Sequence, residues 1–137
     1  MPAKVKTLRN KYVLVHPDGK IVPTTISKSL DKFRHIVCGG DKKALFLLMR
    51  EGRRIRKGHI HFYSFSQPEH KRGVLCWVAR HPGGSILSIE SSKEAVIQSI
   101  PILHDISWEE AFAIGARVHR RFAVLEIPPE QHDKFYI

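Results

Sequence analysis

The first half of the chain opens with two β-branched runs on either side of a turn signal. Residues 11–27 read KYVLVHPDGKIVPTTIS, with Pro17-Asp18-Gly19 between the runs. Proline presets the first turn angle and glycine accepts the positive φ that closes the turn, so this pattern predicts a β-hairpin. Pro23 cannot donate a hydrogen bond to a neighbouring strand, so we expect the second arm to lie at an edge or to be broken there.

Two segments with apolar residues at helical spacing follow the predicted hairpin. Ser27 is a candidate N-cap for a helix that runs to about His35 and that Gly39-Gly40 end. Asp41 is a candidate N-cap for a second helix, KKALFLLMREG, in which Gly52 stands where a C-terminal cap belongs. The expected buried stripe of this second helix is Ala44, Leu45, Leu48 and Met49.

The second half of the chain contains two more candidate helices. Residues 91–103 are ambiguous, because Ser91-x-x-Glu94 resembles a capping box while a β-branched run and Pro101 favour a strand or a broken helix; we favour a helix. Residues 107–122, SWEEAFAIGARVHRRF, combine a capping box with an apolar stripe along their whole length. This pattern predicts one continuous helix.

Between these helical segments the side-chain pattern repeats every two residues, as in a β-strand. From Gly58 onward, alternation predicts a strand with His59, His61, Tyr63 and Phe65 on one face. Residues 73–80 are apolar on both faces, which is typical of a central strand, and residues 85–90 follow after a short turn. Connections this short join antiparallel neighbours, so the three strands are expected to form a meander. Residues 123–129, AVLEIPP, predict a final short strand.

The predicted fold class is therefore α+β. We expect a single domain with a mostly antiparallel sheet, made of the N-terminal hairpin plus the three-strand meander, and about three to four helices packed on it. Residues 1–10 are basic and are expected to be flexible, and residues 11–137 should form the one globular domain. Cys38 and Cys76 lie in apolar surroundings and are expected to be two buried thiols.

The net charge of the chain is the strongest indication of what it binds. Its 23 Lys and Arg exceed its 13 Asp and Glu, which gives a formal net charge of +10. A soluble domain this basic most often binds a polyanion, above all nucleic acid. The chain has neither an apolar run of membrane-spanning length nor a secretion signal, so we expect a cytoplasmic protein that does not enter a membrane.

A cationic stretch beside the aromatic strand is the leading candidate site. Residues 53–57 read RRIRK and are expected to form a loop whose cations meet phosphates, while the rings just downstream can stack on bases. A second cluster ends the predicted 107–122 helix, where three arginines would share one helical face. The candidate nucleic-acid-binding residues are Arg53, Arg54, Arg56, Lys57, His59, His61, Tyr63, Lys71, Arg72, Arg117, Arg120 and Arg121.

The histidines also raise the question of a metal and of catalysis. His59-x-His61 puts two imidazoles on one side of a strand, but two ligands are too few for zinc, so we expect neither a metal nor a cofactor. Small basic ribonucleases move protons with His or Tyr and need no fixed motif. The catalytic candidates on that alternative are His59, His61, Tyr63 and His119, although neighbouring cations favour neutral imidazole and oppose the role of an acid.

Three functions remain after these arguments. The favoured one is a basic nucleic-acid-binding protein, with RNA or single-stranded DNA slightly ahead of duplex DNA. The alternative is a small accessory or inhibitor protein whose basic face docks on an acidic protein surface or in the nucleic-acid channel of a larger complex. The second alternative is a metal-independent ribonuclease, and the balance leans away from an enzyme.

Overall fold

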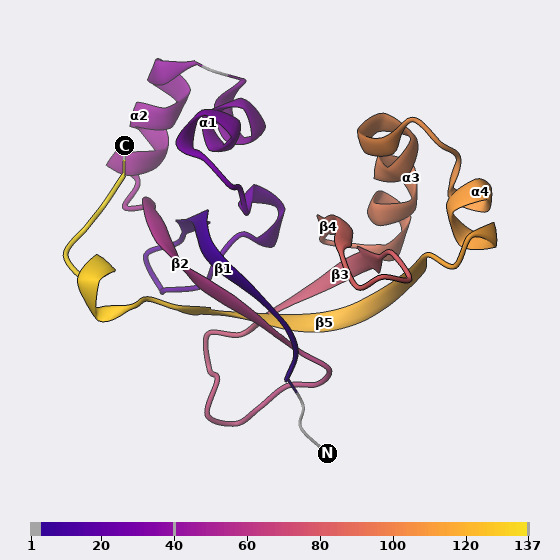
Figure 1. Ribbon diagram of the computed structural model, residues 1–137. Helices are drawn as coiled ribbons and strands as arrows, with labels where there is room; N and C mark the ends of the chain where they lie inside the picture. The colour runs from indigo at the N-terminus through magenta and orange to yellow at the C-terminus, as the bar shows by residue number, and fades with distance from the viewer. Residues whose placement is uncertain (1–3, 40, 137) are drawn as a thin grey trace. The chain divides into compact units, whose positions relative to one another are not determined.

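The computed structural model describes residues 4–39 and 41–136 and has the α+β architecture that the sequence predicts (Figure 1). The strands are β1 (Lys4–Val15), β2 (Arg54–Tyr63), β3 (Val74–Arg80), β4 (Ile86–Glu90) and β5 (Arg117–Glu126). The helices are α1 (Leu30–Cys38), α2 (Lys42–Arg50), α3 (Lys93–His104) and α4 (Trp108–Ala113), with 3-10 turns at Pro23–Thr25 and Pro129–Gln131. The strand order of the sheet is β1-β2-β5-β3-β4. None of the helices described is both long and apolar enough to cross a membrane.

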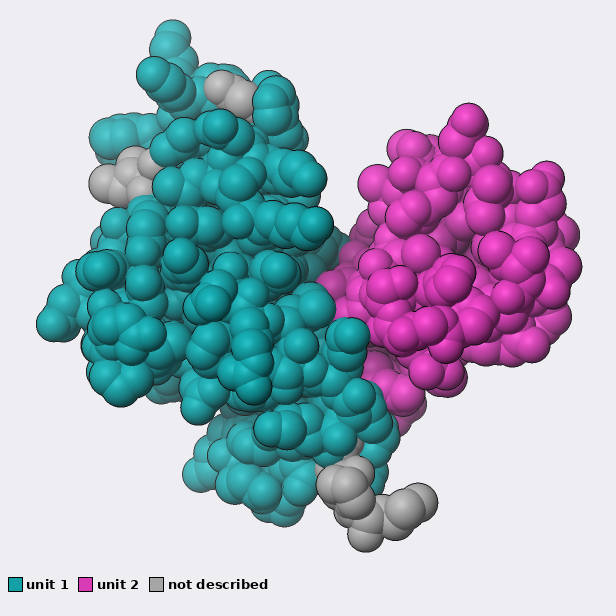
Figure 2. Space-filling model, in the orientation of Figure 1, with its two compact units in different colours: residues 1–74, 122–137 teal, residues 75–121 magenta. Residues whose placement is uncertain are grey.

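The chain forms two compact units (Figure 2). Unit 1 comprises residues 1–74 and 122–137, and unit 2 comprises residues 75–121. Strand β5 begins in unit 2 and ends in unit 1. The expectation of one globular domain over residues 11–137 stays a prediction, and each unit is described by itself below.

Residues 4–10 of unit 1 are part of the sheet. Residues 4–10 belong to β1, which pairs antiparallel with β2 from Lys4↔Tyr63 to Val15↔Arg54. The prediction of a flexible tail is therefore wrong for these residues, and residues 1–3 lie outside the described part. Strand β1 stands at the edge of the sheet, where lysines are favoured because they discourage pairing with other chains. The register shifts between Leu8 and Lys11, around Asn10, whose φ is 54°.

The predicted turn of the hairpin is confirmed. The His16 N–H donates to the Lys20 carbonyl at 2.9 Å, and Gly19 has the positive φ of 89° that closes the turn. The second arm is broken at Pro23, as expected, because a 3-10 turn replaces the strand there. Only isolated bridges connect this arm to β1, such as Val15↔Ile21.

Helices α1 and α2 lie next to each other in unit 1 (Figure 1). The cap of α1 is Ser29 rather than Ser27, and its Oγ accepts the Lys32 N–H at 3.2 Å. Asp41 caps α2 as predicted, since its Oδ1 accepts the Lys43 N–H at 2.9 Å. The two helices contribute to a buried cluster that consists of Leu14, Phe33, Leu45 and Ile55.

The three-strand meander is only partly present. Strands β3 and β4 form the expected antiparallel hairpin, with Trp77 opposite Glu90. Strand β2, in contrast, lies between β1 and β5, so the predicted pairing of β2 with β3 is wrong. Strand β5 lies beside β2 instead and runs antiparallel to it from His59↔Glu126 to Tyr63↔Phe122. It also begins earlier than the predicted strand, at Arg117.

The long helix predicted over residues 107–122 is also wrong. Helix α4 ends at Ala113, and β5 begins at Arg117. Gly115 has φ of +106°, a left-handed backbone conformation that stops a helix and that non-glycine residues rarely adopt. Residues 91–103 do form the favoured helix, which is α3, although Ser92 rather than Ser91 provides the cap. The buried cluster of unit 2 is Ala79, Val96, Ile100, Ala111 and Ala116.

Cys76 is a free, fully buried thiol of unit 2. Burial raises the pKa of Cys76 to about 12, because the thiolate would lose its solvation. The group therefore stays protonated and unreactive at neutral pH. The side chain of Cys38 lies outside the described part of the chain, so the prediction about this second thiol stays untested.

Candidate nucleic-acid interface

One face of the sheet in unit 1 gathers side chains from three strands. Residues directly opposite each other on neighbouring strands project to the same face. On β1, Lys4 lies opposite Tyr63, Thr7 opposite His61 and Tyr12 opposite Lys57. On β5, Glu126 lies opposite His59, Val124 opposite His61 and Phe122 opposite Tyr63. We call this surface the histidine face, and it consists of Lys4, Thr7, Tyr12, Lys57, His59, His61, Tyr63, Phe122, Val124 and Glu126.

The prediction that His59, His61 and Tyr63 share a face is confirmed. Phe65 lies beyond the end of β2 and does not continue the alternation.

His61 is the centre of a hydrogen-bond chain that crosses the three strands. Its Nδ1 lies 2.9 Å from Thr7 Oγ1, and its Nε2 lies 2.9 Å from Glu126 Oε1. The carboxylate of Glu126 can only accept, so Nε2 carries the proton and donates it. In the neutral ring, Nδ1 then accepts the Thr7 hydroxyl proton. Both ring nitrogens of His61 are therefore engaged within the protein.

His59 is held by the irregular part of β1. The Asn10 N–H donates to His59 Nδ1 at 3.2 Å, at the register shift where Asn10 has a left-handed φ. Because Nδ1 accepts this bond, the neutral ring carries its proton on Nε2. His59 can thus offer an N–H from Nε2 to a ligand without being charged.

Glu126 is the one acid of the histidine face. The hydrogen bond from His61 lowers the pKa of this carboxyl below its ordinary value, and the electrostatic effects of His61, His59 and Lys4 act in the same direction. Desolvation opposes these effects but is outweighed. The carboxylate is exposed, so it meets solvent as well as the imidazole.

The His61–Glu126 hydrogen bond leads to a testable pH dependence. Because the pKa of Glu126 is lowered in the folded state, the bond contributes stability above the ordinary pKa of a glutamate, and this contribution is lost as the pH falls through the folded pKa. In a carbon-detected NMR titration, His61→Ala is expected to raise the pKa of Glu126 toward its ordinary value. His35→Ala, which removes an exposed histidine of α1, should leave it where it is. If the pKa of Glu126 is the same in His61→Ala as in the parent protein, the hydrogen bond from His61 is not what lowers it.

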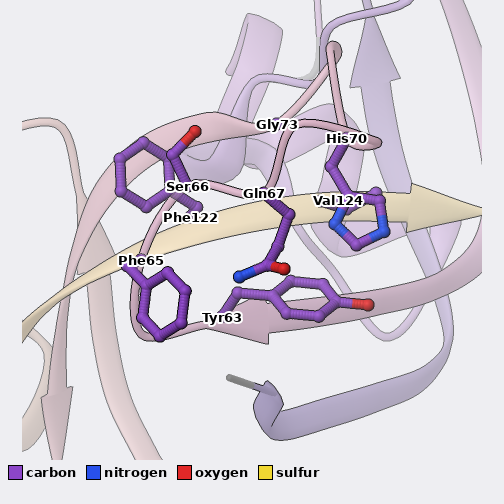
Figure 3. A pocket seen from close by; sticks show the side chains of 8 residues that line it. All are labelled: Tyr63, Phe65, Ser66, Gln67, His70, Gly73, Phe122 and Val124. Atoms are coloured by element: carbon purple, nitrogen blue, oxygen red, sulfur yellow. The ribbon is translucent and has the colours of Figure 1, made fainter. Parts of the chain in front are cut away.

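The loop of residues 64–73 folds over one end of the histidine face (Figure 3). The rings of Tyr63 and His70 lie 4.5 Å apart between centroids, and Tyr63, Phe122 and Val124 line a small hollow together with loop residues. The hollow has a volume of about 10 Å³, which is room for a single water and not for a nucleotide. The ring of Phe65, also part of the lining, is 55% exposed and provides an open stacking surface at this end.

The arginines of residues 53–57 are not in a loop, because Arg54 is already the first residue of β2. By register, Arg54 and Arg56 project to the face opposite His59 and His61. Arg54 Nη1 donates to the Met49 carbonyl at 2.7 Å, and Arg56 Nη2 donates to the His132 carbonyl at 2.8 Å. These hydrogen bonds connect β2 to the end of α2 and to the C-terminal segment. Phosphate binding by Arg54 and Arg56 stays a prediction.

Two further cations of the stretch have different surroundings. Arg53 forms an ion pair with Glu51, and its Nε donates to His16 Nδ1 at 3.2 Å. Lys57 belongs to the histidine face, where its Nζ lies 5.4 Å from the centroid of the Tyr12 ring. This distance is within the range of a cation–π interaction. Of the predicted RRIRK cluster, Lys57 is therefore the cation that stands beside the histidines.

Lys71 and Arg72 are exposed on the loop that covers the end of the histidine face. The side chain of Arg72 lies against Gly19 of the N-terminal turn, where a Cβ would come within 2.7 Å of its Cδ. These two cations add to the exposed positive charge of unit 1. The prediction that they extend a nucleic-acid-binding surface stays untested.

The second predicted cluster belongs to unit 2 and is not helical. On strand β5, Arg117, His119 and Arg121 alternate with Val118 and Arg120, so the prediction that the three arginines share a helical face is wrong. The guanidinium of Arg117 lies 4.0 Å from the centroid of the Phe112 ring.

His119 lies in a crowded cationic environment. Burial lowers the pKa of His119, and the positive charges of Arg121 and Arg80 lower it further. His119 is therefore neutral near pH 7 and adds no positive charge. It belongs to unit 2, whereas His59, His61 and Tyr63 belong to unit 1, so the predicted catalytic set is divided between the units.

The charge of the chain is divided unevenly between the units. Unit 1 has 18 Lys and Arg against 8 Asp and Glu, which is a formal +10, while unit 2 has 5 against 5 and is neutral. The whole net charge therefore resides in the unit that contains the histidine face. Sequence reasoning missed Lys4, Thr7 and Glu126. Regular alternation over residues 4–10 would put Lys4 and Thr7 on opposite faces, and they share a face because the register shifts between Lys4 and Lys6.

Within residues 4–39 and 41–136, no three His, Cys, Asp or Glu side chains gather in a way that could hold a metal ion. Comparisons of the chain with protein-family models, with curated proteins and with solved structures find no match.

Proposed function

We propose that unit 1 binds single-stranded nucleic acid, RNA or DNA, across the histidine face. The observation that carries this proposal is the register of β1 and β2, which puts Lys4 and Lys57 on the same sheet face as His59, His61 and Tyr63. Cations beside rings that a base can reach are the combination that holds single strands, because the cations meet phosphates and the rings stack on bases of any sequence. His59, His61 and Tyr63 are half-buried, so each presents part of its ring. The formal +10 of unit 1 supports the same partner class.

Each part of the face has a distinct task in this proposal. Lys4 and Lys57 neutralise phosphates, and Nε2 of His59 donates a hydrogen bond to a phosphate oxygen. Bases stack on Phe65 and on the exposed part of the Tyr63 ring, at the end of the face where the loop adds Lys71. The carboxylate of Glu126 would repel a phosphate, but its Oε1 accepts a hydrogen bond from His61, which reduces that repulsion.

The geometry favours binding over cleavage. A proton-transfer pair needs ring nitrogens that can reach the substrate, and both nitrogens of His61 are hydrogen-bonded to Thr7 and Glu126. Nδ1 of His59 is occupied by the Asn10 N–H. The ribonuclease alternative therefore has less support from these contacts than the binding proposal.

The direct test is a titration of short fluorescent oligonucleotides with the purified protein, followed by anisotropy at several salt concentrations. Single-stranded RNA and DNA are expected to bind more tightly than a duplex of equal length. The slope of log K against log salt should be roughly −0.7 per phosphate contact, or about −2 for three contacts. A slope near zero, or tighter binding of the duplex, would contradict the proposal. Absence of oligonucleotide binding together with one protein partner recovered after nuclease treatment would favour docking on an acidic protein.

A further inference from the structure

Helix α2 presents large apolar side chains to solvent. Phe46 is 64% exposed and Leu47 is 54% exposed, and together with Lys42 and Lys43 they line a shallow, open hollow. The spacing of four residues puts Lys42 next to Phe46 and Lys43 next to Leu47 on one side of the helix. We call these four residues the basic patch.

Unit 2 carries a counterpart of opposite charge. At the end of α3, Ile102 is 84% exposed and Leu103 is 58% exposed. Asp105 follows them directly, and a short connection leads from α3 to α4 (Figure 1). The first turn of α4 adds Glu109 and Glu110, and all three acids are exposed. We call these five residues the acidic patch.

Neither patch can be hidden by a small adjustment of its own helix. Leu45, on the other side of α2, is buried against Phe33 and Ile55, and in α3 the buried residues are Val96 and Ile100. A rotation that buried the exposed side chains would expose these core residues, which costs roughly 1.5–3 kcal/mol for each large side chain. Exposed apolar groups that are fixed in this way are typical of interaction surfaces.

The two patches are complementary in charge as well as in apolar character. Lys42 and Lys43 stand at the N-terminus of α2, where the helix dipole is positive, and Asp105 stands at the C-terminus of α3, where it is negative. An apolar contact rimmed by opposite charges is the usual anatomy of a specific protein interface.

We propose that the basic patch of one copy of this chain docks on the acidic patch of a second copy. The two surfaces differ, so the contact is head-to-tail, and every copy in such a pair keeps one patch of each kind to bind further copies. The proposal concerns α2 and the α3–α4 connection and does not depend on nucleic-acid binding by the histidine face.

The test is a charge exchange followed by sedimentation equilibrium at low salt and without nucleic acid. The average mass of the wild-type protein should rise with concentration. Lys42→Glu/Lys43→Glu and Glu109→Lys/Glu110→Lys should each weaken the association by about tenfold or more, because like charges then face each other. The protein with all four substitutions should regain it, and so should an equimolar mixture of the two double variants.

Matched controls separate the patches from net charge and from folding. Lys20→Glu/Lys28→Glu makes the same change in charge at exposed lysines outside α2 and should leave the association unchanged. Phe46→Ser/Leu47→Ser should weaken it without lowering the thermal midpoint measured by circular dichroism, since both side chains are exposed. A wild-type protein that stays monomeric at all concentrations, a fourfold variant that does not recover, or an equal effect of the control would overturn the proposal.

Discussion

Lys4→Gln/Lys57→Gln/Lys71→Gln is expected to weaken the binding of single-stranded RNA or DNA by about a hundredfold at ~0.1 M salt. Each phosphate contact with a single strand contributes roughly 0.7 to the slope of log K against log salt, which at ~0.1 M salt is also roughly 0.7 log units of affinity. Three lost contacts therefore amount to about two log units. The slope itself should become shallower by about two, which anisotropy titrations at several salt concentrations measure directly.

The matched control for this triple variant is Lys20→Gln/Lys28→Gln/Lys32→Gln. It removes the same charge from exposed positions that do not belong to the histidine face. If affinity depends on net charge alone, the two triple variants will bind equally weakly, and the histidine face will lose its special role. If the face is the interface, the control retains most of the affinity and of the salt slope.

Gly58→Ala is expected to destabilise the fold by about 2 kcal/mol or more, because a Cβ at this position has no room. It would overlap the backbone carbonyl of Glu126 and lie 2.9 Å from Leu125 Cδ1. The backbones of β2 and β5 would have to separate next to the His59↔Glu126 pair. The thermal midpoint should fall by roughly 8 °C, as circular dichroism can measure, and oligonucleotide binding should weaken with it.

Gly83→Ala provides the control for this substitution. Gly83 is exposed, and a Cβ there would come no closer than 3.4 Å to His81. Its thermal midpoint should stay close to that of the parent. A Gly58→Ala protein as stable as Gly83→Ala would show that β2 and β5 do not approach each other as closely as described.

Signals that act within a few residues predicted the local structure well. Asp41 caps α2, Gly19 closes the N-terminal turn and Gly39 ends α1 with φ of 57°, because caps and turns depend on neighbouring residues alone. The pairing of strands depends on distant residues and was harder to predict. The apolar spacing after residue 107 fits a helix, yet Gly115 ends α4, and the following residues form the strand that pairs with β2.

For the candidate site, too, local features could be predicted from the sequence and long-range contacts could not. Alternation alone placed His59, His61 and Tyr63 on one face. The composition of RRIRK indicated positive charge but could not show that Arg54 and Arg56 point to the opposite face and hydrogen-bond to distant carbonyls. Glu126 could not be assigned to the site either, because it reaches His61 only through the pairing of β2 with β5.

Unit 1 is made of two separate stretches, residues 1–74 and 122–137, so it cannot finish folding until the second stretch has been synthesised. Unit 2 is one continuous stretch, so all of it leaves the ribosome before Phe122 does, and chains are made from the N-terminus. Pairing across such a long separation, as between His61 and Val124, is also slow, because a large loop must close first. A nascent chain that has not yet reached residue 122 therefore carries most of the cations of unit 1 without Glu126 or the third strand of the histidine face.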